Sequence, residues 1–169
     1  GGNIGKPGAG VCPVRGHSNV QGDRTVGINH KPSMEFIDNL EKSTGISSPT
    51  SHGYDSVEAV KAMESGDAKV FLAMGGNFVS AMSDTNRTSN ALTNCDLTVH
   101  ISTKPNRSHL LSGKIGLILP CLGRTEIDES TVGHQFVTVE NSMGIVHSSR
   151  GTSKPASNYL ISEPSIVSG

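Results

Sequence analysis

The stretch AKVFLAMGGN, residues 68–77, decides the fold class of this chain. Its first seven residues form a short apolar run, which is typical of a strand buried in a parallel sheet. Two similar runs follow, DLTVHI at 96–101 and IGLILP at 115–120. A fourth, FVTVE at 136–140, reads as a shorter strand nearer an edge of the same sheet. The sequence therefore predicts a sheet of at least three parallel strands.

Helical patterns lie before and between these runs. Residues 32–45 read as a helix because Pro32 suits a helix start and Gly45 suits a helix end. A second helix begins at Asp55, which forms a capping-box pattern with Glu58. Strands that alternate with helices predict an α/β fold, a three-layer Rossmann-like domain with a mostly parallel sheet between helices.

Polar loops follow the strands of this predicted sheet. Residues 75–77, 100–104 and 121–128 each come directly after an apolar run. Ligands of open α/β sheets bind beyond the carboxyl ends of the strands, so we expect these loops to converge at one edge. Within the last loop, Arg124, Glu126 and Asp128 read as an ion-paired rim. Residues 152–169 lack periodicity and read as an exit segment.

The opening stretch GKPGAGVCPVRGHSNVQGDRTVGI, residues 5–28, is dense in glycine and lacks helix or strand periodicity. Glycine backbone can turn sharply and press against a ligand, and Arg15 and Arg24 offer planar forks for an anion. The segment therefore reads as a ligand-holding loop. Its glycine spacing is not the dinucleotide fingerprint, and the chain has no P-loop motif.

Composition excludes several function classes. The chain has 169 residues, a formal net charge of −1, four Phe, two Tyr and no Trp, which argues against nucleic-acid binding. No apolar run approaches the length of a membrane span, and no signal-peptide pattern opens the chain, so we expect a cytoplasmic protein without a membrane partner. Cys12, Cys95 and Cys121 fit neither a disulfide framework nor a metal motif.

Four blocks of the sequence, in order, resemble one family. They are PVRGHSNVQGDRT at 13–25, FLAMGGNFVSAMSDT at 71–85, LTVHISTKPNRSH at 97–109 and LILPCLGRTEID at 117–128. Together they make residues 3–155 similar to the molybdopterin-dependent, formate dehydrogenase-like oxidoreductases of the dimethyl sulfoxide reductase family. The resemblance implies the fold of the second domain of formate dehydrogenase.

The resemblance also implies a cofactor, molybdopterin guanine dinucleotide with molybdenum or tungsten, and a set of site residues. It carries the active-site arginine onto Arg15, which would orient a small anionic substrate such as formate. His17 stands where well-studied formate dehydrogenases have Gln; the imidazole either keeps the pterin contact and changes proton handling, or marks another substrate. The implied cofactor-binding residues are Gly16, Ser18, Asn19, Gln21, Gly75, Gly76, Asn77, His100, Ser102, Thr103, Lys104 and Asn141.

By the same resemblance, the chain is an internal piece of the alpha subunit of a larger enzyme. The parent would carry an iron–sulfur (4Fe-4S) cluster whose ligands are absent from this chain, and would have an electron-transfer partner. Residues 1–31 would form a cofactor loop, 32–155 the dinucleotide-binding domain and 156–169 the exit toward a missing domain. The piece alone would be inactive. Two alternatives stay open: a free-standing nucleotide-binding sensor and a purely structural interaction domain.

Overall fold

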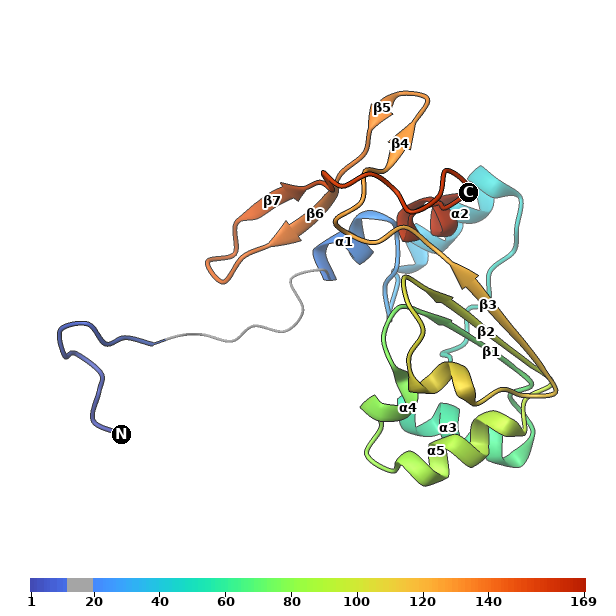
Figure 1. The fold of residues 1–169 in the computed structure, drawn as a ribbon. Coiled ribbons are helices and arrows are strands. Elements are labelled where there is room, and N and C mark those ends of the chain that lie inside the picture. Colours follow the sequence, from blue (N-terminus) through green and yellow to red (C-terminus); the bar gives the residue numbers. More distant parts are fainter. Residues whose placement is uncertain (12–19) are drawn as a thin grey trace.

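A three-stranded parallel sheet lies at the centre of the computed structural model, which describes residues 1–11 and 20–169 (Figure 1). The strands are β1 (Val70–Met74), β2 (Leu97–Ser102) and β3 (Ile115–Pro120), in the order β1-β2-β3. Register pairs Leu72 with Val99 and Val99 with Leu117. The predicted α/β class and the three parallel strands are confirmed.

Helices α3 (Ser56–Ser65), α4 (Phe78–Ala81) and α5 (Thr85–Thr93) cover one face of this sheet, as Figure 1 shows. The core between them contains Met63, Val79 and Leu92, each at most 2% exposed, with Phe71 of β1 packed against it. A 3-10 helix, η1 (Arg107–Leu110), joins β2 to β3 on the same side. Both connections between consecutive strands therefore run over one face.

Local signals set the ends of the helices. Asp55 begins α3 by accepting hydrogen bonds from the backbone N–H groups of Val57 and Glu58, both at 2.9 Å. Helix α2 (Met34–Thr44) ends at Gly45, whose φ of 72° lies in the left-handed region that glycine favours. The helix begins at Met34, two residues after the expected start at Pro32, because the hydroxyl of Ser33 accepts from the Phe36 N–H and so caps the helix.

Helix α6 (Glu163–Ser168) reaches the second face of the sheet. Its Ile166 packs against a small core of Val99, Ile101 and Cys121. The C-terminal segment is therefore not a stretch without structure, as its lack of periodicity suggested. A six-residue helix is too short to show a period, and its sequence signals are confined to its start: the Ser162 N-cap, with Glu163 and Pro164 in the first turn.

The expectation that residues 136–140 join the central sheet is wrong. Strand β6 (Val137–Glu140) pairs antiparallel with β7 (Val146–Ser149) in a separate hairpin, and β4 (Glu129–Ser130) pairs with β5 (Gly133–His134) in another. Helix α1 (Val20–Thr25) lies on β6, where the hydroxyls of Thr25 and Thr138 are 2.7 Å apart. Part of the opening glycine-rich stretch is thus helical, because contact with the hairpin supplies what periodicity does not.

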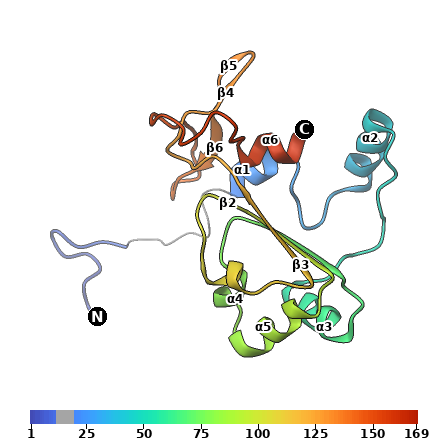
Figure 2. The same cartoon turned by 45° about the vertical axis from the view of Figure 1, so that its right-hand side comes forward.

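The rotated view separates the elements above the sheet. In Figure 2, α1 and α6 lie close together beyond the ends of the strands, while α2 stands apart from them. The separate position of α2 is consistent with its exposure, since none of its residues is buried. In the part of the chain that the structure describes, no helix is both long and apolar enough to cross a membrane.

Candidate functional site

The loops that follow the three parallel strands meet at one edge of the sheet. The Gly75 N–H donates to the Ile101 carbonyl at 2.8 Å, which ties the end of β1 to the end of β2. The Cys121 N–H donates to the Ser102 carbonyl at 3.2 Å, which ties β3 to β2 in the same way. The predicted convergence of these loops is therefore confirmed.

A tight turn, Gly75–Gly76–Asn77, leaves β1 at this edge. Both glycines have a φ of +65°, a conformation that residues with a side chain rarely adopt. A Cβ atom added to Gly76 would meet no atom within 4 Å, so the space beside its backbone is open. The turn therefore presents bare backbone, which is what close approach of a phosphate requires.

Helix η1 and its N-cap residue, Asn106, hold this turn in place. The Asn106 Nδ2 atom donates to the Gly76 carbonyl at 2.7 Å, while its Oδ1 atom accepts from the Ser108 N–H at 2.9 Å. The Ser108 hydroxyl accepts from the Val79 N–H at 3.1 Å and donates to Asn77 Oδ1. The site expected from the sequence contains neither Asn106 nor Ser108. Asn is a preferred N-cap residue, so Asn106 could have been recognised as the start of η1.

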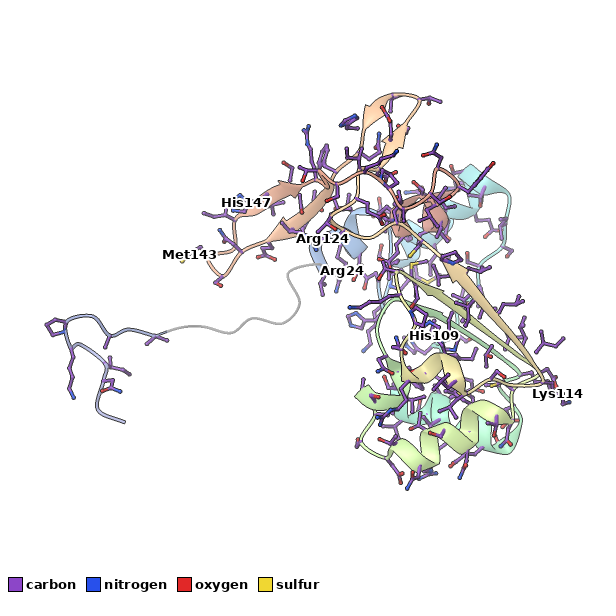
Figure 3. All side chains as sticks on the ribbon, in the orientation of Figure 1. Arg24, His109, Lys114, Arg124, Met143 and His147 are labelled. Atoms are coloured by element: carbon purple, nitrogen blue, oxygen red, sulfur yellow. The ribbon has the colours of Figure 1, made fainter. Side chains whose placement is uncertain are left out.

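His100 lies under the edge rather than on it. Its side chain is 5% exposed, and its ring packs 4.7 Å from the ring of His109 and 6.0 Å from that of Phe71, centre to centre. Figure 3 shows His109 between the sheet and the helices. Lys114, also labelled, lies just before the start of β3, at the end of the sheet away from the candidate site. Burial, reinforced by His109, lowers the pKa of His100. Within residues 1–11 and 20–169, the Nε2 atoms of both imidazoles lack a hydrogen-bond partner.

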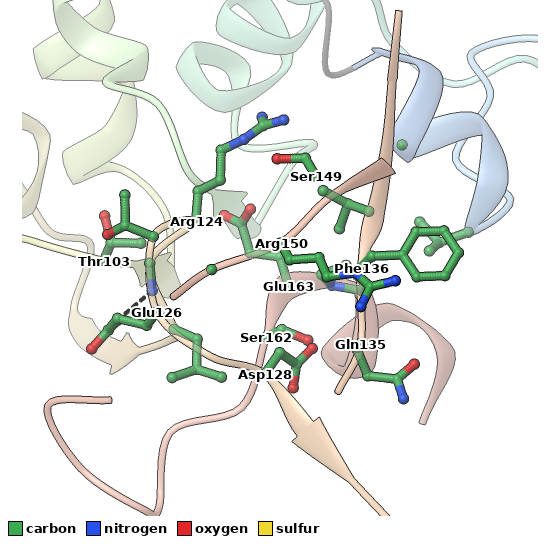
Figure 4. A pocket seen from close by; sticks show the side chains of 18 of the residues that line it. Thr103, Arg124, Glu126, Asp128, Gln135, Phe136, Ser149, Arg150, Ser162 and Glu163 are labelled. Carbon is green, nitrogen blue, oxygen red and sulfur yellow. Dashed lines mark hydrogen bonds between the residues drawn. The ribbon is translucent and has the colours of Figure 1, made fainter. Parts of the chain in front are cut away.

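A cavity of about 920 Å³ opens above the same edge (Figure 4). Thr103 and Lys104, two predicted cofactor-binding residues, line it from the end of β2. Basic and acidic side chains from other elements face the same space. They are Asp23, Arg124, Glu126, Asp128, Arg150 and Glu163.

Two glutamates on the cavity wall have different environments. Burial, with a smaller contribution from Asp23, raises the pKa of Glu163. The pKa of Glu126 is lowered because its two carboxylate oxygens accept from the N–H groups of Gly123 and Ala156, both at 2.6 Å. Glu126 thus closes the rim loop through backbone contacts, where the sequence suggested an ion pair. Glu163 was not expected at the site, because no sequence signal brings α6 there.

The remaining predicted site residues divide into three groups. Ser102 is buried at the end of β2. Gln21 lies on α1, and Asn141 shapes the β6–β7 turn by accepting from the N–H groups of Met143 and Ile145 at 2.9 and 3.1 Å. The others lie outside the described residues, so their roles stay predictions: Arg15, Gly16, His17, Ser18 and Asn19.

The donor set of the described part does not form a metal centre, because no three His, Cys, Asp or Glu side chains there are grouped to hold an ion. What the fold and the site define is an α/β domain of the parallel, open-sheet class, with a cavity lined by apolar and charged side chains at the carboxyl ends of its strands.

Comparison with known proteins relates this chain to larger ones. It is 53% identical over 168 residues to Protein YdeP of Escherichia coli, and this match covers 99% of this chain and 22% of that protein. It is 55% identical over 166 residues to Uncharacterized oxidoreductase Rv2900c of Mycobacterium tuberculosis, covering 98% of this chain and 21% of that protein. Putative formate dehydrogenase YrhE of Bacillus subtilis is 29% identical over 106 residues, 58% of this chain and 11% of that protein. No family model matches the chain.

These similarities agree with the oxidoreductase part of the resemblance seen in the sequence. The chain spans about a fifth of the length of these two larger relatives, 22% of YdeP and 21% of Rv2900c. The molybdopterin cofactor and formate as substrate stay predictions.

Proposed function

We propose that this chain is an α/β domain of a larger molybdopterin-dependent oxidoreductase of the formate dehydrogenase-like kind. Its part would be to form one wall of the cleft that holds the guanine dinucleotide arm of the cofactor. One observation carries the proposal: the bare backbone of the Gly75–Gly76–Asn77 turn follows Met74, which lines a large cavity, at the edge where open α/β sheets bind nucleotides.

The residues present fit such a group. A Cβ atom on Gly75 would lie 3.2 Å from Glu163 Oε1, so a side chain there would crowd the wall of the cavity. The cavity volume, about 920 Å³, is near the upper end of ordinary ligand sites. Thr103 and Lys104 are exposed on its rim, where a hydroxyl and an ammonium group suit phosphate oxygens.

The proposal gives each residue a limited task. Lys104 would neutralise a pyrophosphate, and the turn at Gly76 would let the phosphate approach the backbone. Burial raises the pKa of Glu163, which makes its carboxylate easier to protonate when a phosphate approaches. When bound, the molybdenum or tungsten centre supplies two-electron redox chemistry. Arg15 would orient an anionic substrate such as formate, with His17 beside it.

The test is metal and nucleotide analysis of the full-length parent protein, purified anaerobically from a host that makes the cofactor. We expect molybdenum or tungsten, iron from the cluster, and guanosine monophosphate released by acid. Lys104→Ala should lower the guanosine monophosphate content, whereas Lys61→Ala, an exposed position on α3, should not. A parent without metal or nucleotide would refute the proposal. Nucleotide without metal would favour the sensor alternative, because the cavity would then be filled by a ligand that does no redox chemistry.

A further inference from the structure

One side of the central sheet carries a patch of apolar side chains that the described residues leave uncovered. In-register parallel strands present alternate residues to the same side, so β1 and β3 contribute to one patch. Val70 and Leu72 of β1 are 61% and 63% exposed. We call this patch the open face, and it consists of Val70, Leu72, Ile115, Leu117 and Leu119.

Helix α6 covers only the middle of this side. Val99 and Ile101 of β2 are buried against Ile166, while the outer strands stay exposed. A six-residue helix is about 9 Å long, whereas a six-residue strand extends about 20 Å. The covering layer therefore begins at the carboxyl edge of the sheet and stops short of the rest.

The two connections between the strands of the sheet do not cover the open face. The chain steps from β1 to β2 and from β2 to β3 in the same direction, and both connections lie on the face opposite the open face. Connections of one hand that step in one direction always lie on one face of a sheet. A helix that connects two strands of this sheet across the open face would therefore step in the reverse direction, and residues 1–11 and 20–169 contain no such connection.

We propose that the open face binds an amphipathic helical layer from the polypeptide that lies outside residues 1–169 in the full-length parent. Parallel sheets are buried on both faces, almost always by helices, and α6 already begins such a layer. About four-fifths of each of the longer relatives lies outside the matched region, since the match covers 21% and 22% of them. The inference rests on the part of the proposed function that makes this chain a domain of a larger protein, and is independent of the cofactor.

The first experiment measures thiol accessibility in the native full-length parent. Leu72→Cys and Leu117→Cys place thiols on the open face, and Val132→Cys, at an 88% exposed position between β4 and β5, is the control. Maleimide labelling is followed by mass spectrometry of each labelled peptide. We expect both open-face thiols to react at least about tenfold more slowly than the control, since labelling requires local opening. In urea all three should react alike. Labelling of both open-face thiols at the control rate in the folded protein would overturn the proposal.

The second experiment identifies the occupant. A photo-crosslinking amino acid at Leu72 should join this position to a peptide from outside residues 1–169 of the same chain. A crosslink to a second copy, with protection that is lost on dilution, would overturn the proposal in favour of a dimer. Neither experiment reads metal or nucleotide. A protected open face in a parent without cofactor would support this inference while refuting the proposed chemistry, and an exposed open face in a loaded enzyme would do the reverse.

Discussion

Replacing Asn106 removes the side chain that joins η1 to the Gly75–Gly76–Asn77 turn. In Asn106→Ala two hydrogen bonds are lost, one from Nδ2 to the Gly76 carbonyl at 2.7 Å and one from the Ser108 N–H to Oδ1 at 2.9 Å. Loss of the helix cap costs about 1 kcal/mol. Loss of the contact with Gly76 costs about 1 kcal/mol more. We therefore expect the free energy of unfolding to fall by about 2 kcal/mol in total.

A second variant separates the two contributions. Asn106→Asp keeps an oxygen that caps η1 but cannot donate to the Gly76 carbonyl, so we expect a loss of about 1 kcal/mol. Asn90→Ala is the control, because Asn90 is exposed on α5 and a surface change of this kind shifts stability by less than about 0.5 kcal/mol. Urea unfolding followed by far-ultraviolet circular dichroism measures all three. If Asn106→Ala proves no less stable than Asn90→Ala, the anchoring of the turn by η1 is refuted.

Three further outcomes follow from the same geometry. A Cβ atom on Gly113 would lie 2.2 Å from the backbone oxygen of Cys95, so Gly113→Ala should lower the midpoint of thermal unfolding strongly, whereas Gly53→Ala, with nothing within 4 Å, should not. Burial lowers the pKa of His100 from its usual 6.5, so the unfolded chain takes up a proton at this residue more readily than the folded chain does. The free energy of unfolding should therefore fall as the pH drops below about 6.5, and His100→Gln should weaken this dependence in urea titrations. Burial raises the pKa of the Cys95 and Cys121 thiols, so both should resist iodoacetamide in the native protein and react after unfolding. Peptide mass spectrometry measures this labelling, and fast labelling of the native protein would contradict their burial.

Local sequence signals determined the three parallel strands and the ends of their helices. An apolar run ending in Gly75 is sufficient for a strand and its turn, and Asp55 and Gly45 act on the nearest backbone groups. The meeting of the loops at one edge also followed from the sequence, because strands that run parallel bring their carboxyl ends together.

Only the tertiary structure decided which side of the sheet is covered and where the later segments lie. Side chains alternate along β2, so His100 and Val99 lie on opposite sides of the sheet. Which side the helices cover depends on how the chain crosses the sheet. His100 is buried because η1 and the helices lie on its side. Strand β6 has the same local pattern in a hairpin as in a sheet. Its place is decided by pairing with the neighbouring β7 and by contact with the distant helix α1, where Thr25 meets Thr138. Glu163 reaches the cavity for the same reason, since α6 is placed by the packing of Ile166 on the sheet and not by any pattern of its own.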